Sequence, residues 1–358
     1  MKKIQVVPGW SFRDDSGNQL DPKLFKLLHA LDERGKLTAA AKDAGISYRH
    51  GWNLLNKWAA FFGSPLVELQ KGRGAWLTPL GEKLLWAEKR VIARLEPQIE
   101  NLASELNIEI ERTLEGIKPT LRLHASHGYA VALLPRFADQ IQLDLQYKSA
   151  EDALAALNRG ACDLAGFHVP VDMMSESLIA TYSHQLKPRG HKIIRFISRT
   201  QGLMVKAGNP KAVHTVADLS REDVRFINRQ KNSGTRALLD ELLRREAVNA
   251  AHITGFVDEE FTHSAVAAFV AAGMADVGFG VEASAHQFGL EFIPVTTELY
   301  LLLCHQRALG QEAIQRFLES IRSDKFQQAV RALPGYEPVE CGKVVAIESL
   351  LPWYRKSP

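Results

Sequence analysis

The chain has 358 residues, of which 46% are hydrophobic and 24% charged, which is enough for two or three folded domains with sizeable cores. Its longest apolar run, residues 265–275, is about half as long as a membrane span requires, and the apolar residues after Lys3 are too few for a signal peptide. The composition therefore excludes a membrane-spanning chain and predicts a cytoplasmic location.

Charge is unevenly distributed along the chain. Residues 1–80 hold 12 Lys and Arg against 7 Asp and Glu, whereas the remaining residues hold 32 against 34. A basic N-terminal segment suits a nucleic-acid partner. The three cysteines, Cys162, Cys304 and Cys341, are far apart and odd in number, and the histidines lack the spacing of a zinc site. We therefore expect reduced thiols, no metal site and no cofactor.

Three helices are predicted before residue 60. Pro22–Arg34 carries leucines at helical spacing. An alanine-rich helix follows, with Thr38 as its expected cap, and Gly45 supplies the turn after it. Ser47 is a suitable N-cap for a third helix over Tyr48–Trp58. This order of elements is that of a helix-turn-helix.

The third helix has one apolar face and one polar face. The apolar positions are Gly51, Leu54, Leu55 and Trp58. The residues predicted to meet DNA are the cap, the first turn and the outward face: Ser47, Tyr48, Arg49, Trp52, Asn53, Asn56 and Lys57. Asn, Arg and Lys can hydrogen bond to base edges and phosphates. The alternative is an ordinary amphipathic helix pair inside an all-α core.

A β-hairpin is expected after the third helix. Two short apolar runs, Leu66–Gln70 and Ala75–Leu77, flank a basic, glycine-rich tip that contains Lys71 and Arg73. Such a hairpin can serve as a DNA-binding wing, so Lys71 and Arg73 join the predicted DNA contacts. Thr78-Pro79 then opens another helix.

Two stretches carry a family resemblance. Ala41–Tyr48 and Leu77–Gly81 resemble the winged helix-turn-helix of LysR-type and ModE-like (molybdate-responsive) bacterial regulators. The resemblance covers roughly residues 1–85 and implies that this part is a domain that binds operator DNA.

Residues 86–116 are predicted to form a linker helix that mediates dimerisation. Within the helical stretch 82–114, apolar residues alternate at spacings of three and four: Ile92, Leu95, Ile99, Leu102 and Leu106. This pattern predicts a homodimer or tetramer through the helix. Pro97 should kink the helix or split it in two. A single helix packed on its own chain remains the alternative.

Residues 117–358 alternate strands with helices, which predicts an α/β domain. The expected strands are Leu121–Ala125, Leu143–Tyr147, Leu164–Val169, Lys192–Ile197, Leu203–Lys206, Val224–Ile227, Val277–Gly280 and Leu299–Cys304. A faint internal repeat, which pairs residues 149–167 with residues 264–279, indicates two lobes, the second over about 203–297. The repeated strand pattern resembles the periplasmic-binding-protein fold, which is the effector domain of LysR-type regulators.

An anion site is predicted between the lobes, where polar loops lead into helix N-termini. The expected ligand-binding residues are Ser126, His127, Ser149, His168, Ser233, Gly234, Thr235, Arg236, Thr262 and His263. Plain N-capping is the alternative for each loop. Arg236 could equally face solvent.

Residues 232–236 and 160–170 resemble the substrate-binding-like domain found with molybdenum-cofactor biosynthesis proteins. The chain lacks the small molybdate-binding modules that ModE-like regulators carry, so molybdate sensing does not follow from its first domain. The combined resemblance implies a regulator of genes for molybdenum- or tungsten-dependent enzymes such as formate dehydrogenases. Molybdate, tungstate or a small carboxylate such as formate are the candidate effectors. A cytoplasmic binding protein or an enzyme on the same fold remain alternatives, although no catalytic motif is present.

Overall fold

A computed structural model of the chain describes residues 4–9, 13, 15, 17, 19, 21–70, 74–114, 118–171 and 182–351. The chain forms two compact units, Val7–Ala93 and, with the N-terminal residues, Arg94–Pro358. Within the described residues no helix combines the length and apolarity needed to cross a bilayer.

The first unit is a three-helix core. Its helices are α1 (Lys23–Arg34), α2 (Leu37–Asp43) and α3 (Tyr48–Phe62). The expected third helix is confirmed, and the Ser47 side chain accepts a hydrogen bond from the backbone of His50 as its N-cap. The expectation that Thr38 caps α2 is wrong, because the helix already begins at Leu37, whose buried side chain draws that residue into the core.

A two-stranded antiparallel sheet completes this unit. β1 (Val67–Gln70) pairs with β2 (Gly74–Leu77), as expected for a wing. The predicted contacts Lys71 and Arg73 at its tip lie outside the described residues. Gly81 allows the next helix to approach the sheet, since a Cβ at this position would lie 2.1 Å from the carbonyl oxygen of Leu66.

The helix α4 (Pro79–Leu114) runs from the first unit into the second. The Thr78 hydroxyl caps its start by accepting a hydrogen bond from Gly81. Leu85 is buried in the core of the first unit, which therefore extends beyond the winged helix itself. Pro97 lies inside α4, and the helix continues on both sides of it without being split.

The second unit is an α/β structure, as predicted. Its strands are β3 (Thr120–Ala125), β4 (Gln142–Tyr147), β5 (Leu164–Pro170), β6 (His191–Val205), β7 (Phe226–Arg229), β8 (Glu259–Glu260), β9 (Val277–Val281), β10 (Glu291–His305), β11 (Tyr336–Pro338) and β12 (Val344–Val345). They form a sheet in the order β4-β3-β5-β10-β6-β9-β7-β8, with β11 and β12 paired to β6.

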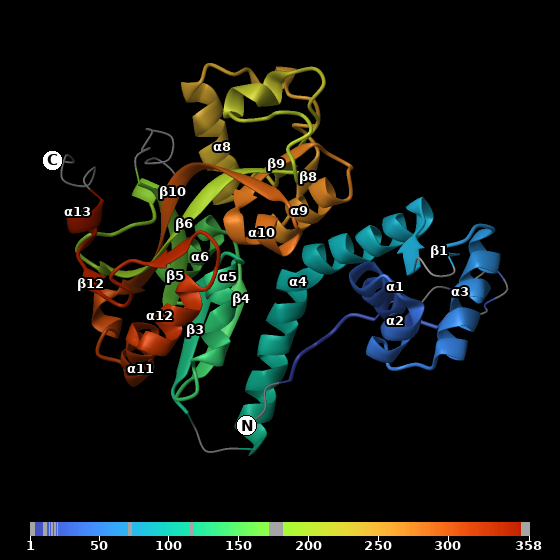
Figure 1. Cartoon of the computed structure of the whole chain (residues 1–358). Coiled ribbons are helices and arrows are strands. Elements are labelled where there is room, and N and C mark those ends of the chain that lie inside the picture. The colour runs from blue at the N-terminus through green and yellow to red at the C-terminus, as the bar shows by residue number, and fades with distance from the viewer. Residues whose placement is uncertain are drawn as a thin grey trace. The chain divides into compact units, whose positions relative to one another are not determined.

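Two long antiparallel strands cross the whole unit (Figure 1). The first half of β6 pairs with the second half of β10 beside β5, and the other halves pair beside β9. The prediction of two separate strands, Lys192–Ile197 and Leu203–Lys206, is therefore wrong. The polar residues Ser198–Gln201 interrupt the apolar run, yet they continue the strand. We refer to residues 118–199 and 298–351 as the first lobe and to residues 200–297 as the second lobe.

Helices cover both faces of the sheet in each lobe, which explains why its central strands are almost uniformly buried. The helices are α5 (Tyr129–Leu133), α6 (Ala150–Asn158), α8 (Gly234–Arg245), α9 (His263–Ala271), α10 (Glu282–Gln287), α11 (Glu312–Arg322), α12 (Asp324–Arg331) and α13 (Ile347–Leu350). β7 begins and ends two residues later than the predicted strand Val224–Ile227, which moves Arg229 from a loop to the end of a buried strand.

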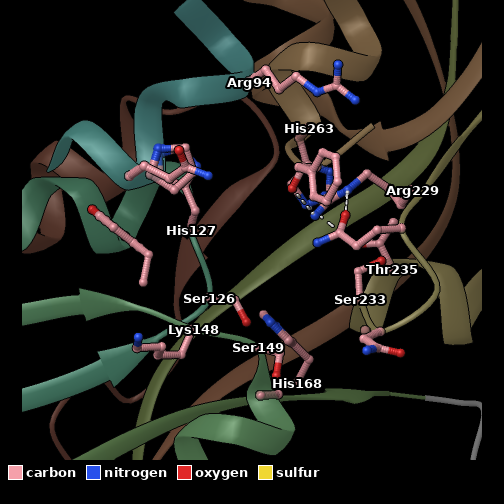
Figure 2. A pocket seen from close by; sticks show the side chains of 18 of the residues that line it. Arg94, Ser126, His127, Lys148, Ser149, His168, Arg229, Ser233, Thr235 and His263 are labelled. Atoms are coloured by element: carbon pink, nitrogen blue, oxygen red, sulfur yellow. Dashed lines mark hydrogen bonds between the residues drawn. The ribbon is translucent and has the colours of Figure 1, made fainter. Parts of the chain in front are cut away.

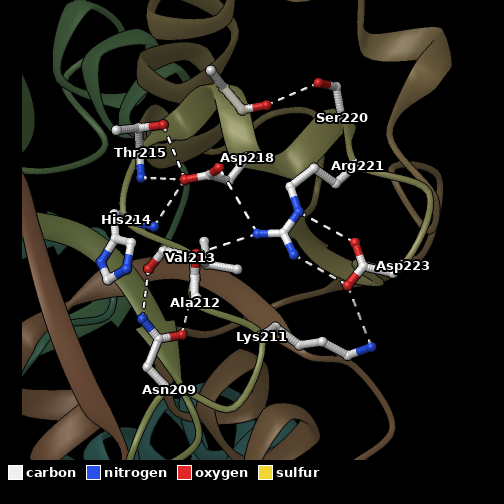
Figure 3. Close-up of polar contacts among 11 residues, drawn as sticks. Asn209, Lys211, Ala212, Val213, His214, Thr215, Asp218, Ser220, Arg221 and Asp223 are labelled. Atoms are coloured by element: carbon white, nitrogen blue, oxygen red, sulfur yellow. Dashed lines mark hydrogen bonds and ion pairs between the residues drawn. The ribbon is translucent and has the colours of Figure 1, made fainter.

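The connection between β6 and β7 is held by local polar contacts (Figure 3). Asp218 accepts hydrogen bonds from the backbone of His214 and Thr215 at 2.9 and 2.8 Å. Arg221 pairs with Asp223 at 3.1 Å. These polar contacts add to the burial of Val213, Val216 and Leu219 of the same loop in the core of the second lobe.

Candidate functional site

A cavity of about 340 Å³ lies in the second unit, bordered by both lobes and by α4. Its walls come from the loop after β3, the carboxyl ends of β4, β5 and β7, the centre of β6 and the N-termini of α8 and α9. Figure 2 shows the labelled side chains of the first lobe, among them Ser126, Lys148 and Ser149, facing Arg229, Ser233 and His263 of the second. The volume is at the lower end of the range for small-ligand sites.

Eight of the ten residues predicted to bind an effector line this cavity. They are Ser126, His127, Ser149, His168, Ser233, Gly234, Thr235 and His263. The tertiary structure brings them together from loops spread over residues 126–263 of the sequence.

The other two predicted residues, Arg236 and Thr262, do not line the cavity. The guanidinium of Arg236 pairs with Asp240 at 2.9 Å and with Glu259 at 3.3 Å. Thr262 is buried and caps α9 by accepting a hydrogen bond from Ala265 at 2.9 Å. Thr262 is thus the ordinary helix cap left open as its alternative. Arg236 fits neither of its two expectations, because it does not line the cavity and it does not face solvent, with only 7% of the residue exposed.

Arg199, which lines the cavity, belongs to a buried ion pair that joins the two crossing strands. Arg199 of β6 and Glu298 of β10 are paired in the strand register, and their side chains meet at 2.5 Å. Gln201 donates to the same carboxylate oxygen at 2.6 Å and to the hydroxyl of Thr235 at 3.2 Å. Burial alone would raise the pKa of Glu298, but Arg199 outweighs it and lowers the pKa, so the carboxylate stays ionised.

Arg229 provides a second buried guanidinium in the cavity wall, and only 8% of the residue is exposed. Its hydrogen bonds go to neutral acceptors, the Gln230 side chain at 3.1 Å and the Phe261 carbonyl at 3.0 Å. No carboxylate of the described residues forms an ion pair with it. Burial and the neighbouring Arg199 lower the pKa of Arg229 to about 9, so it remains charged at neutral pH.

The charges in the cavity wall therefore do not cancel. Four lining residues are positively charged, Arg94, Lys148, Arg199 and Arg229, and none is an Asp or a Glu. Two of them are paired with buried carboxylates, Arg199 with Glu298 and Arg94 with Glu260. An uncompensated buried charge is costly, typically by several kcal/mol. A bound anion would relieve this cost, which makes the cavity suited to an anionic ligand.

Two buried histidines next to these arginines are held neutral. Burial and Arg199 lower the pKa of His168 to about 3, and its Nδ1 lies 3.2 Å from Arg199 Nη2. Burial and Arg229 place the pKa of His263 well below its usual value. Neutral imidazoles can donate hydrogen bonds to an anion without adding charge.

The N-terminus of α8 also points free donors towards this region. Ser233 caps the helix by accepting from the backbone of Arg236 at 3.1 Å, which is the capping role left open as the alternative. Gly234 permits a close approach, since a Cβ there would lie 3.2 Å from the ring of His168. Backbone N–H groups at such a helix start favour negative charge.

Sequence reasoning missed Arg199, Arg229 and Glu298. All three lie on strands whose limits were misjudged: Arg229 ends β7, and Arg199 and Glu298 lie in the middle of long crossing strands. A charged residue at the end of an otherwise apolar strand was the available signal for Arg229. Nothing local indicates that Arg199 and Glu298 are neighbours, because they are 99 residues apart.

The predicted DNA-contacting residues of α3 share one exposed face. Ser47, Tyr48, Arg49, Trp52, Asn53, Asn56 and Lys57 are all exposed. The predicted inward residues Gly51, Leu54, Leu55 and Trp58 are all buried, which confirms the expected amphipathic pattern. Tyr48 and Trp52 are 51% and 42% exposed, an unusual degree for large aromatic side chains.

Comparison with known proteins identifies the second unit. Residues 132–322 match the family model described as the PBP superfamily domain. This match confirms the periplasmic-binding-protein-like domain that the sequence pattern predicts.

Individual relatives are similar over parts of the chain. The uncharacterised protein YvgK of Bacillus subtilis is 33% identical over 201 residues, which are 56% of this chain and 64% of YvgK. The transcriptional regulator ModE of Yersinia pestis is 27% identical over 34% of this chain and 48% of ModE. The chain thus spans less than two thirds of either relative. These findings confirm the predicted resemblance to ModE-like regulators.

CbnR, a LysR family transcriptional regulator, aligns with 84% of this chain and 99% of its own, at 18% identity and a TM-score of 0.40.

Proposed function

The chain belongs to the PBP superfamily. We propose that it is a DNA-binding transcriptional regulator whose α/β unit binds a small anion as effector. The main support for an anionic effector is Arg229, a buried guanidinium in the cavity wall that donates hydrogen bonds only to neutral acceptors. The observation behind the DNA-binding part is the exposed polar and aromatic face of α3 beside a β-hairpin wing.

The helix α4 supplies a physical connection between the two activities. It begins directly after the wing, and its residues Arg94, Leu95, Pro97 and Gln98 line the cavity. Arg94 pairs with the buried Glu260 at 3.3 Å and stacks over the ring of Phe261 at 5.2 Å. The Phe261 carbonyl in turn accepts a hydrogen bond from Arg229. Phe261 thus contacts both Arg229 and Arg94 of α4, and it connects a ligand bound at Arg229 to the helix.

The effector candidates are molybdate, tungstate and a small carboxylate such as formate, and the regulated genes would serve molybdenum- or tungsten-dependent enzymes. The family resemblance supports the first two ions. The excess of positively charged lining residues and the volume of about 340 Å³ also accommodate a larger organic anion.

A selection experiment with the full chain tests DNA binding. Duplexes that the protein retains from a random pool should share a sequence motif, and mobility shifts on that motif should change when molybdate, tungstate or formate is added. If no duplex is enriched over a control pool, the regulator proposal fails.

Calorimetry with the same anions tests the effector site. Thr235→Val keeps the shape and removes a hydroxyl at the cavity wall, so it should weaken anion binding by about 1–2 kcal/mol and leave effector-free DNA binding intact. Ser126→Ala should act in the same direction. Unchanged dissociation constants in both variants would place the ligand elsewhere.

A further inference from the structure

Three potential metal ligands meet at the edge of the cavity, although the sequence gives no metal-binding motif. Glu96 and Glu100 are four residues apart on one face of α4, and His127 follows β3. His127 Nε2 lies 3.8 Å from Glu96 Oε2 and 3.4 Å from Glu100 Oε2. One donor atom from each residue falls within a cluster no wider than 4.8 Å.

Two of these donor atoms face each other as an ion pair but form no hydrogen bond. His127 Nε2 and Glu100 Oε2 are both inaccessible to solvent, and neither has a hydrogen-bond partner among the described residues. Buried polar atoms of this kind are rare in folded proteins and call for an explanation. The His127 ring is fixed by its edge-on packing against Tyr147, at 4.8 Å between centroids, and its side chain is only 16% exposed.

We propose that Glu96, Glu100 and His127 bind one divalent first-row transition ion of the Zn²⁺ or Mn²⁺ class. Ligand atoms about 2.1 Å from such an ion lie roughly 3.0–3.4 Å from one another. Small side-chain rotations would therefore bring the three donor atoms from their observed separations to those of a metal site. The imidazole favours these ions over Mg²⁺ and Ca²⁺, which prefer oxygen ligands alone.

The ion would also change the electrostatics at the edge of the cavity. Two carboxylates next to an anion site repel the ligand, whereas a bound divalent ion neutralises them. The three protein ligands leave coordination positions open, as in metal sites that bind a further ligand. The ion would also tie α4 to the loop after β3. This inference goes beyond the proposed regulatory function and does not depend on it.

Metal titration of the full chain, freed of metals by chelation, tests the proposal without DNA or effector. Calorimetry with Zn²⁺ and with Mn²⁺ should show one site per chain, with Mg²⁺ binding more weakly. Co²⁺ should give visible absorption bands that indicate a nitrogen ligand. Glu100→Gln and His127→Gln should each weaken binding by at least about tenfold.

A matched control is Glu105→Gln, which removes an exposed carboxylate from the same helix and should leave binding unchanged. Circular dichroism checks that each variant is folded, and Glu96→Gln replaces any variant that is not. If the wild-type chain binds no ion more tightly than the folded variants do, the cluster is an ordinary contact of His127 with the two carboxylates, and the metal proposal is wrong.

Discussion

Arg229 shows at the scale of one residue how a ligand site differs from a stable core. Its charge is buried without a carboxylate partner, whereas the neighbouring Arg199 is paired with Glu298. Nothing in folding favours such an arrangement, because desolvating an unpaired charge costs free energy. Its presence in a cavity wall is therefore best explained by a ligand.

Replacing Arg229 should stabilise the ligand-free protein and weaken its binding of anions. Arg229→Met should raise the free energy of unfolding of the ligand-free protein by about 1–3 kcal/mol, because it removes an unpaired buried charge. The same change should abolish the rise in melting temperature that anions produce. Thermal unfolding with and without anion measures both effects. A destabilised variant that still responds to anions would contradict the assignment.

The buried histidines predict how stability depends on pH. In the unfolded chain His168 and His263 take up protons below about pH 6.5, whereas in the folded chain the pKa of His168 is about 3 and that of His263 is also lowered. The unfolded state therefore binds more protons, and stability should fall as pH drops from 6.5 towards 3, by up to about 1.4 kcal/mol per pH unit for each histidine.

Urea unfolding at pH 7.5, 6.0 and 5.0 measures this dependence. His263→Asn should reduce the loss of stability between pH 6.0 and 5.0, whereas the exposed His252→Asn should leave it unchanged. An identical pH dependence in His263→Asn and the wild type would mean that His263 is charged in the folded protein.

At the scale of one element, α3 separates a structural face from a functional one. Its buried residues pack against α1 and α2, while Arg49, Asn53 and Lys57 are free to meet another molecule. The exposed Tyr48 and Trp52 add apolar area on the same face, which favours an interaction surface over a merely solvated one.

Arg49→Ala should relax sequence preference by about 1–3 kcal/mol at the base pairs that Arg49 contacts, because a lost base-edge contact removes discrimination. Competition between the selected motif and scrambled duplexes measures this difference. The matched control is Arg331→Ala, an exposed arginine on α12 in the other unit. Unchanged affinity and specificity in Arg49→Ala would show that the recognition face is assigned wrongly.

At the scale of the whole molecule, α4 presents apolar side chains that its own chain leaves uncovered. Leu102 and Leu106 of the predicted seam are 59% and 39% exposed, whereas Leu95 lines the cavity. The opposite side of the helix is attached to β4 by hydrogen bonds, among them that from the Tyr147 backbone to Asn101 at 2.6 Å. One face of the helix is thus packed on its own chain, as the alternative interpretation predicts, and a homodimer through the exposed face stays a prediction.

Leu102→Glu should therefore break a homodimer, since it places two carboxylates against each other across the seam, at a cost of several kcal/mol. Sedimentation measures the change from dimer to monomer. Val257→Glu, at a residue that is 85% exposed in the second lobe, is the matched control. A Leu102→Glu variant that still sediments as a dimer would rule out this seam, though not dimerisation through another surface.

The sequence by itself determined the local features of this protein. Apolar periodicity, capping residues and glycine turns act between neighbours in the chain, so α3, the wing hairpin, α4 and most strands of the α/β unit could be predicted. The polar loops at the ends of strands also identified eight of the residues that line the cavity.

Only the tertiary structure decided how charges are placed. Arg199, Glu298 and Arg229 acquire their roles from strand register and burial, and the Glu96, Glu100 and His127 cluster joins a helix to a loop that lies 27 residues further along the chain. Packing between distant segments decides whether an arginine side chain faces solvent, pairs with a carboxylate or lines a cavity. The local pattern of residues in the sequence does not encode this packing. For this reason Arg236 was a plausible ligand contact in the sequence and is a salt-bridged arginine outside the cavity wall in the structure.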